Sequence, residues 1–536
     1  MPTGLGLGLG LTFGGGGETG AATLVGSYDD GFAVDFTDAS VFLRDSSTPS
    51  NNIDSSGRID GSGALIGPGA ALTNTSPAVF SALQSDGFHR FIPRQMYLNS
   101  AAPANQSITV VVGRSYNIVI TGSVSISLSG AASGTVTAGT TSFTAATTTL
   151  TCGSTSGSGT VHVYPTPNDT GYLAAAGAIT SDLPYEWSIA GKQIGIRADP
   201  TATNKALHST DVSNAAWTKF NATVSDDVAA GPIEGFSYDK IVEDSASSAA
   251  HGIYQTQTTT IGVRECTWCI VKAAERSWIY MTEGNNVTAT AYFNIGSGAV
   301  GTVSGTGSPT GRIKDLGDGW YLCQMSFTPI GAASNFQIRV TTGDTIFTHN
   351  GDGASGVLFA HGQFETGPEP TSIIITHGAE DSRALIQLTR ATSAIPFSTT
   401  VGTIYAAFTV YDITTDIRCV VQIDDGTNNN VIGVYQYQAT AGAFVANGGT
   451  TVADQNDAVA VGQSVKVAMS WAANDILFSI DGVTQTPDTS AAIPTGLTTL
   501  RIGHRAGPAN GGNMTVKEIL EIPQTSSQAT LNAMTA

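Results

Sequence analysis

Short runs of β-branched and apolar residues, separated by Gly and Ser, make up most of the chain from residue 107 onward. The first of these runs lie at 109–112, 116–121, 124–128 and 160–164. Runs of this length that end at turn residues are typical of strands, and every second side chain of a strand points to the same face. The pattern predicts a small antiparallel β-sandwich over residues 106–166.

Two longer stretches, 204–376 and 397–536, follow the same pattern. The first has strand-like runs at 267–271, 278–281, 289–295, 320–327, 336–340 and 357–364. The second has them at 404–411, 419–424, 431–436, 464–471, 476–480 and 499–503, with an amphipathic helix expected at 527–534. Each stretch is long enough for a two-sheet jelly roll. The predicted fold class is therefore all-β, with serial β-sandwich (jelly-roll) modules behind an extended Gly-rich N-terminal segment.

The segments outside these modules have a different character. Leu5, Leu7, Leu9 and Leu11 alternate with Gly, which would place the leucines on one face of an extended chain. Two interpretations of this start remain open: a flexible tail, or a strand that adds to the sheet of a partner. We expect 1–105 to be a partly irregular docking segment, 167–203 a connector that contains Pro and Gly, and 377–396 a linker.

Composition and charge exclude several classes of function. Only 12% of the 536 residues are charged, and acids outnumber bases so that the formal net charge is −19. Nucleic acid and anionic membrane surfaces require clustered Lys and Arg, so neither is an expected partner. No apolar run reaches the roughly 20 residues that span a bilayer, and no basic segment precedes the leucines as in a secretory signal. The charge also argues against strongly anionic glycans as ligands.

Few residues suggest chemistry. Asp424, Asp425 and Asn428 crowd a predicted hairpin tip, where their oxygens could hold a structural calcium ion or could simply satisfy a tight turn. A GxGxxG pattern begins at Gly351, but a strand is expected after it, which indicates a turn and not a phosphate loop. HExxH and GxSxG motifs are absent from the sequence. We expect no catalytic residues, no cofactor and no enzymatic activity.

Tryptophan and cysteine side chains are expected in the interior. Trp320 and Trp471 fall on predicted strands and are assigned to sandwich cores, although one exposed aromatic ring could stack on a sugar. Cys266 and Cys269 form a CxxC within a single predicted strand, where residues three apart point to opposite faces. A redox pair needs a helix N-terminus to lower the thiol pKa, so we expect buried, reduced thiols.

Particular stretches resemble known families. In the second module, SNAAW at 213–217, GDGWY at 317–321 and GDGASGVLFAHGQFETGPEPTSIIIT from 351 resemble carbohydrate-binding-like jelly rolls of bacteriophage virion and tail proteins. The third module resembles a laminin-G/concanavalin-A-like jelly roll in VVQIDDGTNNNVIGVYQ from 420, SW at 470–471, IDGV at 480–483 and TTLRIG at 498–503. The Gly–Leu start is similar to the starts of phage virion proteins. Since laminin-G-like relatives sometimes bind calcium, this resemblance adds to the calcium interpretation.

The resemblance implies a structural protein of a bacteriophage particle, namely a tail fibre or receptor-binding adhesion protein that recognises a host-surface glycan or protein receptor. It further implies a homotrimer that is made in the host cytoplasm, resides in the virion and attaches to other virion proteins through its N-terminal segment. A capsid-attached head fibre or decoration protein is the alternative. A polysaccharide depolymerase is a third interpretation, which the lack of a fixed sequence repeat disfavours.

Overall fold

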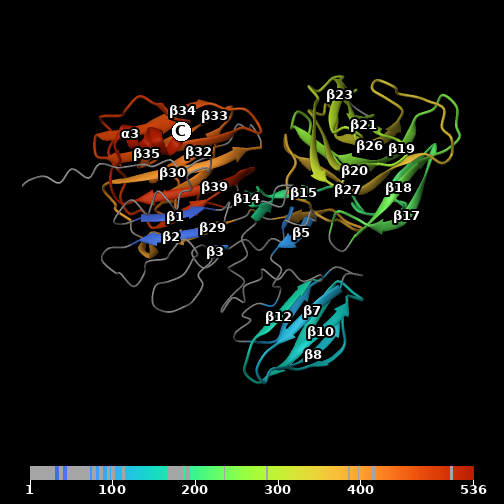
Figure 1. Cartoon of the computed structure of the whole chain (residues 1–536), viewed down its shortest axis with the longest axis horizontal. Coiled ribbons are helices and arrows are strands. Elements are labelled where there is room, and N and C mark those ends of the chain that lie inside the picture. Colours follow the sequence, from blue (N-terminus) through green and yellow to red (C-terminus); the bar gives the residue numbers. More distant parts are fainter. Residues whose placement is uncertain are drawn as a thin grey trace, which may run out of the picture.

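The computed structural model describes residues 31–35, 40–44, 73–74, 80–83, 89–92, 97, 103–110, 115–165, 185–187, 193–233, 236–284, 288–383, 385, 387–395, 397–411, 417–507 and 511–536. Figure 1 shows three β-rich bodies, which we call the first, second and third modules in chain order. The described secondary structure is almost entirely strand, and the predicted all-β fold class of serial sandwiches is confirmed.

The first module is a small sandwich of two antiparallel sheets. One sheet has the order β10 (Gly139–Thr144), β7 (Ser115–Ile120), β12 (Val161–Pro165). The other has the order β6 (Gln106–Thr109), β11 (Thr149–Ser156), β8 (Ser125–Gly130), β9 (Gly134–Val136). Tyr116, Ile118 and Ile120 alternate along β7 and pack against Ile126 and Leu150 in a buried core. Alternation of apolar with Ser and Thr side chains therefore builds this module.

The second module is a sandwich of two six-stranded antiparallel sheets. The upper sheet in Figure 1 has the order β16 (Thr218–Phe220), β19 (His251–Thr258), β26 (Ala333–Thr341), β21 (Trp278–Glu283), β22 (Thr290–Asn294), β23 (Ala299–Ser304). The lower sheet has the order β17 (Ala222–Ala230), β18 (Ser237–Glu243), β27 (Gly356–Thr366), β20 (Glu265–Ala273), β25 (Trp320–Phe327), β24 (Thr310–Gly317). Their facing sides enclose a buried core that includes Trp217, Phe293 and Phe359.

The third module packs two larger sheets around one core. One has the order β13 (Tyr185–Trp187), β14 (Gln193–Ala198), β39 (Met514–Ile522), β30 (Gly402–Val410), β35 (Ser464–Ala472), β36 (Asp475–Ile480), β37 (Val483–Thr484). The other has the order β3 (Thr73–Asn74), β29 (Leu388–Ala391), β38 (Thr499–Ile502), β31 (Arg418–Asp424), β32 (Val431–Tyr437), β33 (Thr440–Asn447), β34 (Thr450–Ala458). Helix α3 (Gln528–Thr535), capped by Ser527, covers the outer face of the first sheet with Leu531 and Met534.

Strands from the N-terminal part of the chain join the third module. β1 (Gly31–Asp35) pairs with both β2 (Ser40–Arg44) and β39, and β3 pairs with β29. The remaining short elements are the pair β4 (Phe80–Leu83) and β5 (His89–Ile92), the pair β15 (Ala202–Asn204) and β28 (Asp381–Arg383), and the 3-10 turn η2 (Thr392–Ala394). The sheets of the third module thus take in strands from the expected docking segment and from the expected connector.

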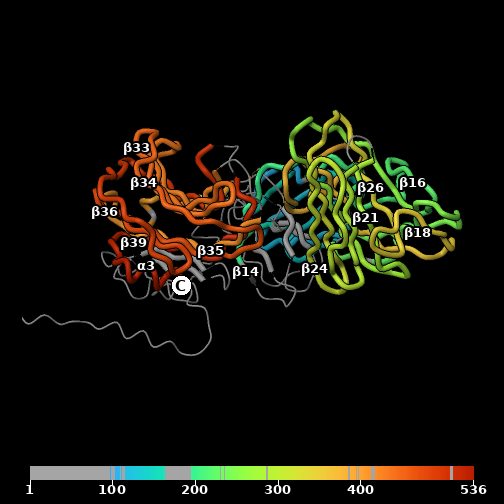
Figure 2. Tube along the Cα trace, turned by 90° about the horizontal axis from the view of Figure 1, so that it is seen from above, coloured from blue at the N-terminus to red at the C-terminus, as the bar shows by residue number. Residues whose placement is uncertain are grey.

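The second and third modules lie side by side, as the view from above shows (Figure 2). Contacts between them run through the segment after β27: Arg197 of β14 donates to the carbonyl oxygen of Pro370 at 3.1 Å, and Asn513 donates to the same oxygen at 3.1 Å. In the described part of the chain, no helix has the length and apolar character needed to cross a membrane.

Candidate functional site

The outer faces of the two sheets in the second module differ in what covers them. On the lower sheet, Trp268, Ile270 and Trp320 pack under Ile233 and Ile373, which belong to neighbouring segments of the same module. That outer face is therefore a second, internal core. The outer face of the upper sheet instead carries aromatic side chains, and part of their surface meets solvent.

The aromatic side chains of the upper sheet align across five strands. Phe220 is opposite Gly252, Gly252 is opposite Arg339, Arg339 is opposite Tyr280, and Tyr280 is opposite Tyr292. The residues that alternate with them point the other way and are buried in the module core: Ile253, Ile338, Ile279 and Phe293. The period of two in a strand thus places an apolar residue inside and an aromatic or Arg residue outside.

We call Phe220, Tyr254, Tyr280, Tyr292 and Phe347 the aromatic face. The Tyr280 and Tyr292 rings stack with centroids 4.8 Å apart, and the Phe347 ring lies 5.4 Å from Tyr280. The rings of Phe220 and Tyr254 are 6.0 Å apart. Phe347 is 50% exposed, whereas Tyr280 is fully buried beneath it. The face therefore has a rigid aromatic base and an exposed ring above it.

Arg339 lies in the middle of the aromatic face. Its guanidinium carbon is 4.7 Å from the centroid of Phe347, 5.1 Å from that of Phe220 and 5.4 Å from that of Tyr280. Its Nε and Nη2 donate to the side-chain oxygen of Gln337 at 2.9 and 2.6 Å, and its Nη1 donates to the Tyr280 hydroxyl at 3.0 Å. These contacts fix the cation in one position among the rings.

Tyr280 and Tyr292 stay protonated at neutral pH. Burial raises the pKa of Tyr292 to about 12, and burial also raises the pKa of Tyr280 above its ordinary value. The Tyr280 hydroxyl donates to the carbonyl oxygen of Phe347 at 2.8 Å. This bond ties the exposed ring of Phe347 to the sheet below it.

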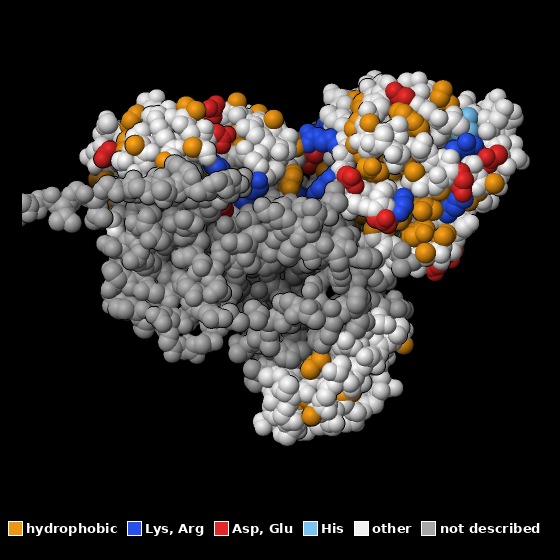
Figure 3. All heavy atoms as spheres, viewed as in Figure 1, with side chains coloured by type: hydrophobic (Ala, Val, Ile, Leu, Met, Phe, Trp, Pro, Cys, Tyr) orange, Lys and Arg blue, Asp and Glu red, His pale blue; other side chains and the backbone are white. Residues whose placement is uncertain are grey.

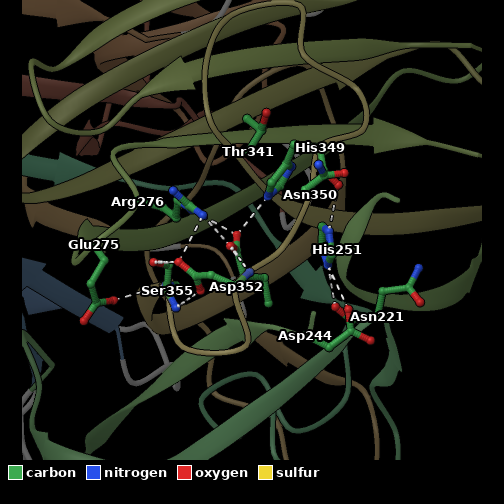
Figure 4. Close-up of polar contacts among 12 residues, drawn as sticks. Asn221, Asp244, His251, Glu275, Arg276, Thr341, His349, Asn350, Asp352 and Ser355 are labelled. Atoms are coloured by element: carbon green, nitrogen blue, oxygen red, sulfur yellow. Dashed lines mark hydrogen bonds and ion pairs between the residues drawn. The ribbon is translucent and has the colours of Figure 1, made fainter. Parts of the chain in front are cut away.

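The loop that carries Phe347 connects β26 to β27, and polar contacts of its residues His349 and Asp352, labelled in Figure 4, anchor it to the sheets. Glu243, at the end of β18, is fully buried. It accepts from Arg276 Nε at 3.0 Å, from the Asp352 amide at 3.1 Å, and pairs with His349 Nε2 at 2.8 Å. Although burial alone would raise the pKa of Glu243, the hydrogen bonds from Arg276 and His349 hold it below its usual value.

The rings of two histidines, His251 and His349, lie close together and are tilted by 50° to each other (Figure 4). The rings of His251 and His349 have centroids 4.6 Å apart, and His251 Nδ1 lies 2.7 Å from the Asn221 carbonyl oxygen. Gly351 allows the loop backbone to lie against the backbone of Asp244, because a Cβ at Gly351 would be only 1.9 Å from the carbonyl oxygen of Asp244. Asp352 accepts from the Ser355 amide and hydroxyl, which hold its pKa well below the usual range. We call these contacts around Glu243, His251 and His349 the Glu243 network; they connect the loop between β26 and β27 to strands of both sheets.

The residues predicted for calcium lie on the tip of the β31–β32 hairpin, but their oxygens face different donors. Asp424 is fully buried and pairs with Arg501 Nε at 2.7 Å. Asp425 accepts from the Thr427 amide at 2.9 Å, and Asn428 accepts from Gln422 at 3.2 Å. These contacts are hydrogen bonds and an ion pair within the hairpin and its neighbouring strand. The calcium site stays a prediction.

A cluster of three carboxylates in the second module could hold a divalent cation. Asp211, Asp226 and Asp239 each have a carboxylate oxygen within 4.8 Å of the others. Burial, with added repulsion from Asp226 and Asp211, raises the pKa of Asp239 to about 6. Asp239 also accepts from the Val212 amide at 2.8 Å. Carboxylate oxygens are the ligands that Ca²⁺ prefers, and sequence spacing did not predict this group.

The interior assignments made from sequence are confirmed. Trp320 and Trp471 are 5% and 0% exposed. Cys266 and Cys269 are buried and unpaired, and they lie in different hydrophobic clusters on opposite sides of β20. The aromatic face was not predicted from the sequence. Its signal is a Tyr at an outward position of a strand such as 278–281, where the alternation elsewhere in this chain places Ser or Thr.

No protein-family model and no curated protein matches the chain. Solved structures with partial similarity include the CBM40 domain of the Ruminococcus gnavus IT-sialidase bound to α2,3-sialyllactose, at 17% identity over 26% of this chain and 84% of that one, with a TM-score of 0.23. Domain 4 of AbnA, a GH43 extracellular arabinanase from Geobacillus stearothermophilus, in complex with arabinotriose, is 10% identical over 30% of this chain and 77% of that one, with a TM-score of 0.24. Sheep galectin-11 in complex with glycerol is 9% identical over 25% of this chain and 95% of that one, with a TM-score of 0.18. Likenesses at this level have no bearing on ligand or activity.

Proposed function

We propose that this protein binds carbohydrate, without cleaving it, at the aromatic face of its second module. The observation that carries the proposal is the ordered row of rings on the outer face of a sheet, with Phe347 half exposed above buried Tyr280. Exposed apolar surface of this kind marks interaction sites, and rings with neighbouring hydroxyl and amide groups suit the apolar faces and hydroxyls of sugars.

The rigidity of the aromatic face supports the same function. The Glu243 network and the bond from the Tyr280 hydroxyl to the Phe347 carbonyl oxygen hold the exposed ring in place before a ligand arrives. A preformed site avoids the entropic cost of ordering side chains on binding.

Binding to a glycan panel tests the proposal on the full-length protein. We expect the protein to bind at least one glycan, and Phe347→Ala to weaken that binding at least tenfold because the exposed stacking ring is lost. Ile330→Ala is the matched control, since Ile330 is 66% exposed on a different loop. Absence of glycan binding, or equal binding by Phe347→Ala, would overturn the proposal. Release of reducing ends from a bound glycan would identify an enzyme instead.

We further propose that the protein acts as an adhesion component of a bacteriophage particle, such as a tail fibre, with the N-terminal segment attached to other virion proteins. The sequence resemblance of the second module and of the Gly–Leu start to phage virion proteins supports this placement. A homotrimer would multiply weak glycan contacts through avidity. Antibody labelling of intact particles distinguishes tail from head attachment, and light scattering of the purified chain measures the oligomeric state.

A further inference from the structure

We propose that Arg339 makes the aromatic face selective for glycans that carry a carboxylate, such as uronic or sialic acids. This inference rests on the proposed glycan-binding function and specifies the class of ligand. It concerns one cation in a chain whose net charge is −19. That net charge predicts weak binding of anionic ligands, so any preference for an anion must come from the local surroundings of Arg339.

Arg339 differs in its partners from Arg276 and Arg312 of the same module. Arg276 pairs with the carboxylates of Glu243 and Asp352, and Arg312 pairs with Glu369 at 3.3 Å. Within the described residues, no carboxylate lies at ion-pair distance from Arg339; its hydrogen-bond acceptors are the neutral Gln337 amide and the neutral Tyr280 hydroxyl. In an acidic protein, this leaves a positive charge for which a ligand can supply the counter-ion.

A count of donors shows what the guanidinium can still bind. Its five N–H groups include three that donate to Gln337 and Tyr280, through Nε, Nη2 and Nη1. The other two N–H groups, one on Nη1 and one on Nη2, have no acceptor among the described residues. A carboxylate has two oxygens and commonly accepts a pair of hydrogen bonds from one guanidinium. The unused donors therefore match a carboxylate better than a single hydroxyl.

The surroundings of Arg339 provide for the rest of such a sugar. Phe347 lies 4.7 Å from the guanidinium carbon and is half exposed, so a sugar ring that stacks on it has its substituents within reach of Arg339. Asp344, on the same loop, is not at ion-pair distance from Arg339, and its carboxylate instead accepts from the Thr302 amide and hydroxyl, each at 2.9 Å. The rings also shield the cation partly from water, which strengthens its attraction for an anion.

The experiment compares probes that differ only in charge. We would measure the affinity of the full-length protein for tri-galacturonic acid and its methyl ester, and for sialyllactose and lactose. The expected result is at least tenfold tighter binding of one acidic probe than of its neutral counterpart, with an affinity that falls as NaCl rises. Which acidic probe binds distinguishes uronic from sialic acids.

Variants assign the effect to Arg339. Arg339→Gln should remove the preference for the acidic probe, so that the variant binds the acidic probe and its neutral counterpart with affinities within about twofold of each other. Arg312→Gln, the same change at an ion-paired arginine of the opposite sheet, should keep the preference. Arg339→Lys retains charge but not the paired donors, and should lose part of the preference. If Arg339→Gln does not fold, the comparison of acidic and neutral probes on the unmodified protein still tests whether the site prefers a carboxylate.

The outcomes separate the two proposals. Equal binding of acidic and neutral probes, or an unchanged preference in Arg339→Gln, would overturn the role of Arg339 while leaving glycan binding intact. Absence of binding to every probe and to the wider glycan panel would overturn the proposed function itself.

Discussion

At the scale of single residues, buried carboxylates in this protein are stabilised in contrasting ways. Asp424 pairs with Arg501, and Glu365 accepts from the indole of Trp268 at 2.8 Å and from the amide of Thr371 at 2.9 Å. Glu521 on β39 is only 1% exposed, and among the residues that the structure describes neither of its carboxylate oxygens has a hydrogen-bond partner. Burial without a partner disfavours the charged form, so the pKa of Glu521 lies well above its ordinary value.

Glu521→Gln should therefore stabilise the third module at neutral and alkaline pH. The folded state holds a proton on Glu521 that the unfolded chain releases above about pH 4.3. The free energy of unfolding thus falls by about 1.4 kcal/mol for each pH unit above that value, until the folded pKa is reached. Glutamine has no such proton to lose, so the stability advantage of the variant in urea unfolding should be small at pH 4 and should grow as pH rises, until the folded pKa of Glu521 is reached.

The control for Glu521→Gln is Asp457→Asn, which removes an exposed acid from β34 of the same module. Its stability relative to the unmodified protein should not change with pH in this way. A Glu521→Gln variant whose advantage is constant between pH 4 and pH 8 would contradict the argument.

At the scale of elements, the aromatic face depends on how closely β19 and β26 approach. Gly252 is opposite Arg339, and a Cβ at Gly252 would lie 2.3 Å from the Ile338 carbonyl oxygen and 3.1 Å from Arg339 Cγ. The glycine thus leaves room for the Arg339 side chain to extend toward Phe220. A side chain at this position would force the two strands or the arginine to move.

Gly252→Ala should lower stability and weaken glycan binding together. Overpacking between two strands typically costs about 1–3 kcal/mol, and here the displaced group is the cation of the binding face. Denaturant unfolding and glycan affinity measure the two effects. Gly378→Ala is the matched control, because a Cβ at Gly378 meets nothing within 4 Å. Unchanged affinity in a destabilised Gly252→Ala variant would show that the close approach serves stability alone.

Local alternation was enough to predict many strands but not the site they form. The run at 278–281 predicted a strand, and β21 spans Trp278–Glu283. Its partner β26 begins at Ala333, and the pairing that places Tyr280 opposite Arg339 depends on long-range register. Phe347 lies on a loop with no strand pattern, and contacts with Glu243 of another sheet position that loop. Residues that act together through register and loop anchoring leave little local signal.

At the scale of the whole molecule, a buried charge cluster joins the second and third modules. Figure 3 shows Lys and Arg side chains gathered where these modules meet. Asp199 is fully buried there and pairs with Arg197 at 3.0 Å and with Arg383 at 3.8 Å, and it accepts from the Ser372 hydroxyl. Burial alone would raise the pKa of Asp199, but Arg383 and Arg197 lower it below its ordinary value. The cluster links β14, β28 and the segment after β27.

Asp199→Asn should loosen this junction while leaving both module cores folded. Removal of one partner leaves buried arginines uncompensated, which typically costs about 3–5 kcal/mol. Since the folded pKa of Asp199 is lowered, its contribution is present above about pH 3.9 and is lost as pH falls through the folded pKa. The difference from the unmodified protein should therefore be full at pH 7 and shrink below pH 4. Calorimetry should show transitions that separate in the variant, with faster proteolysis in 377–396. Asp381→Asn, at an exposed position on β28, is the control and should change neither the calorimetric transitions nor the rate of proteolysis. A single unshifted transition in Asp199→Asn would refute the role of this junction.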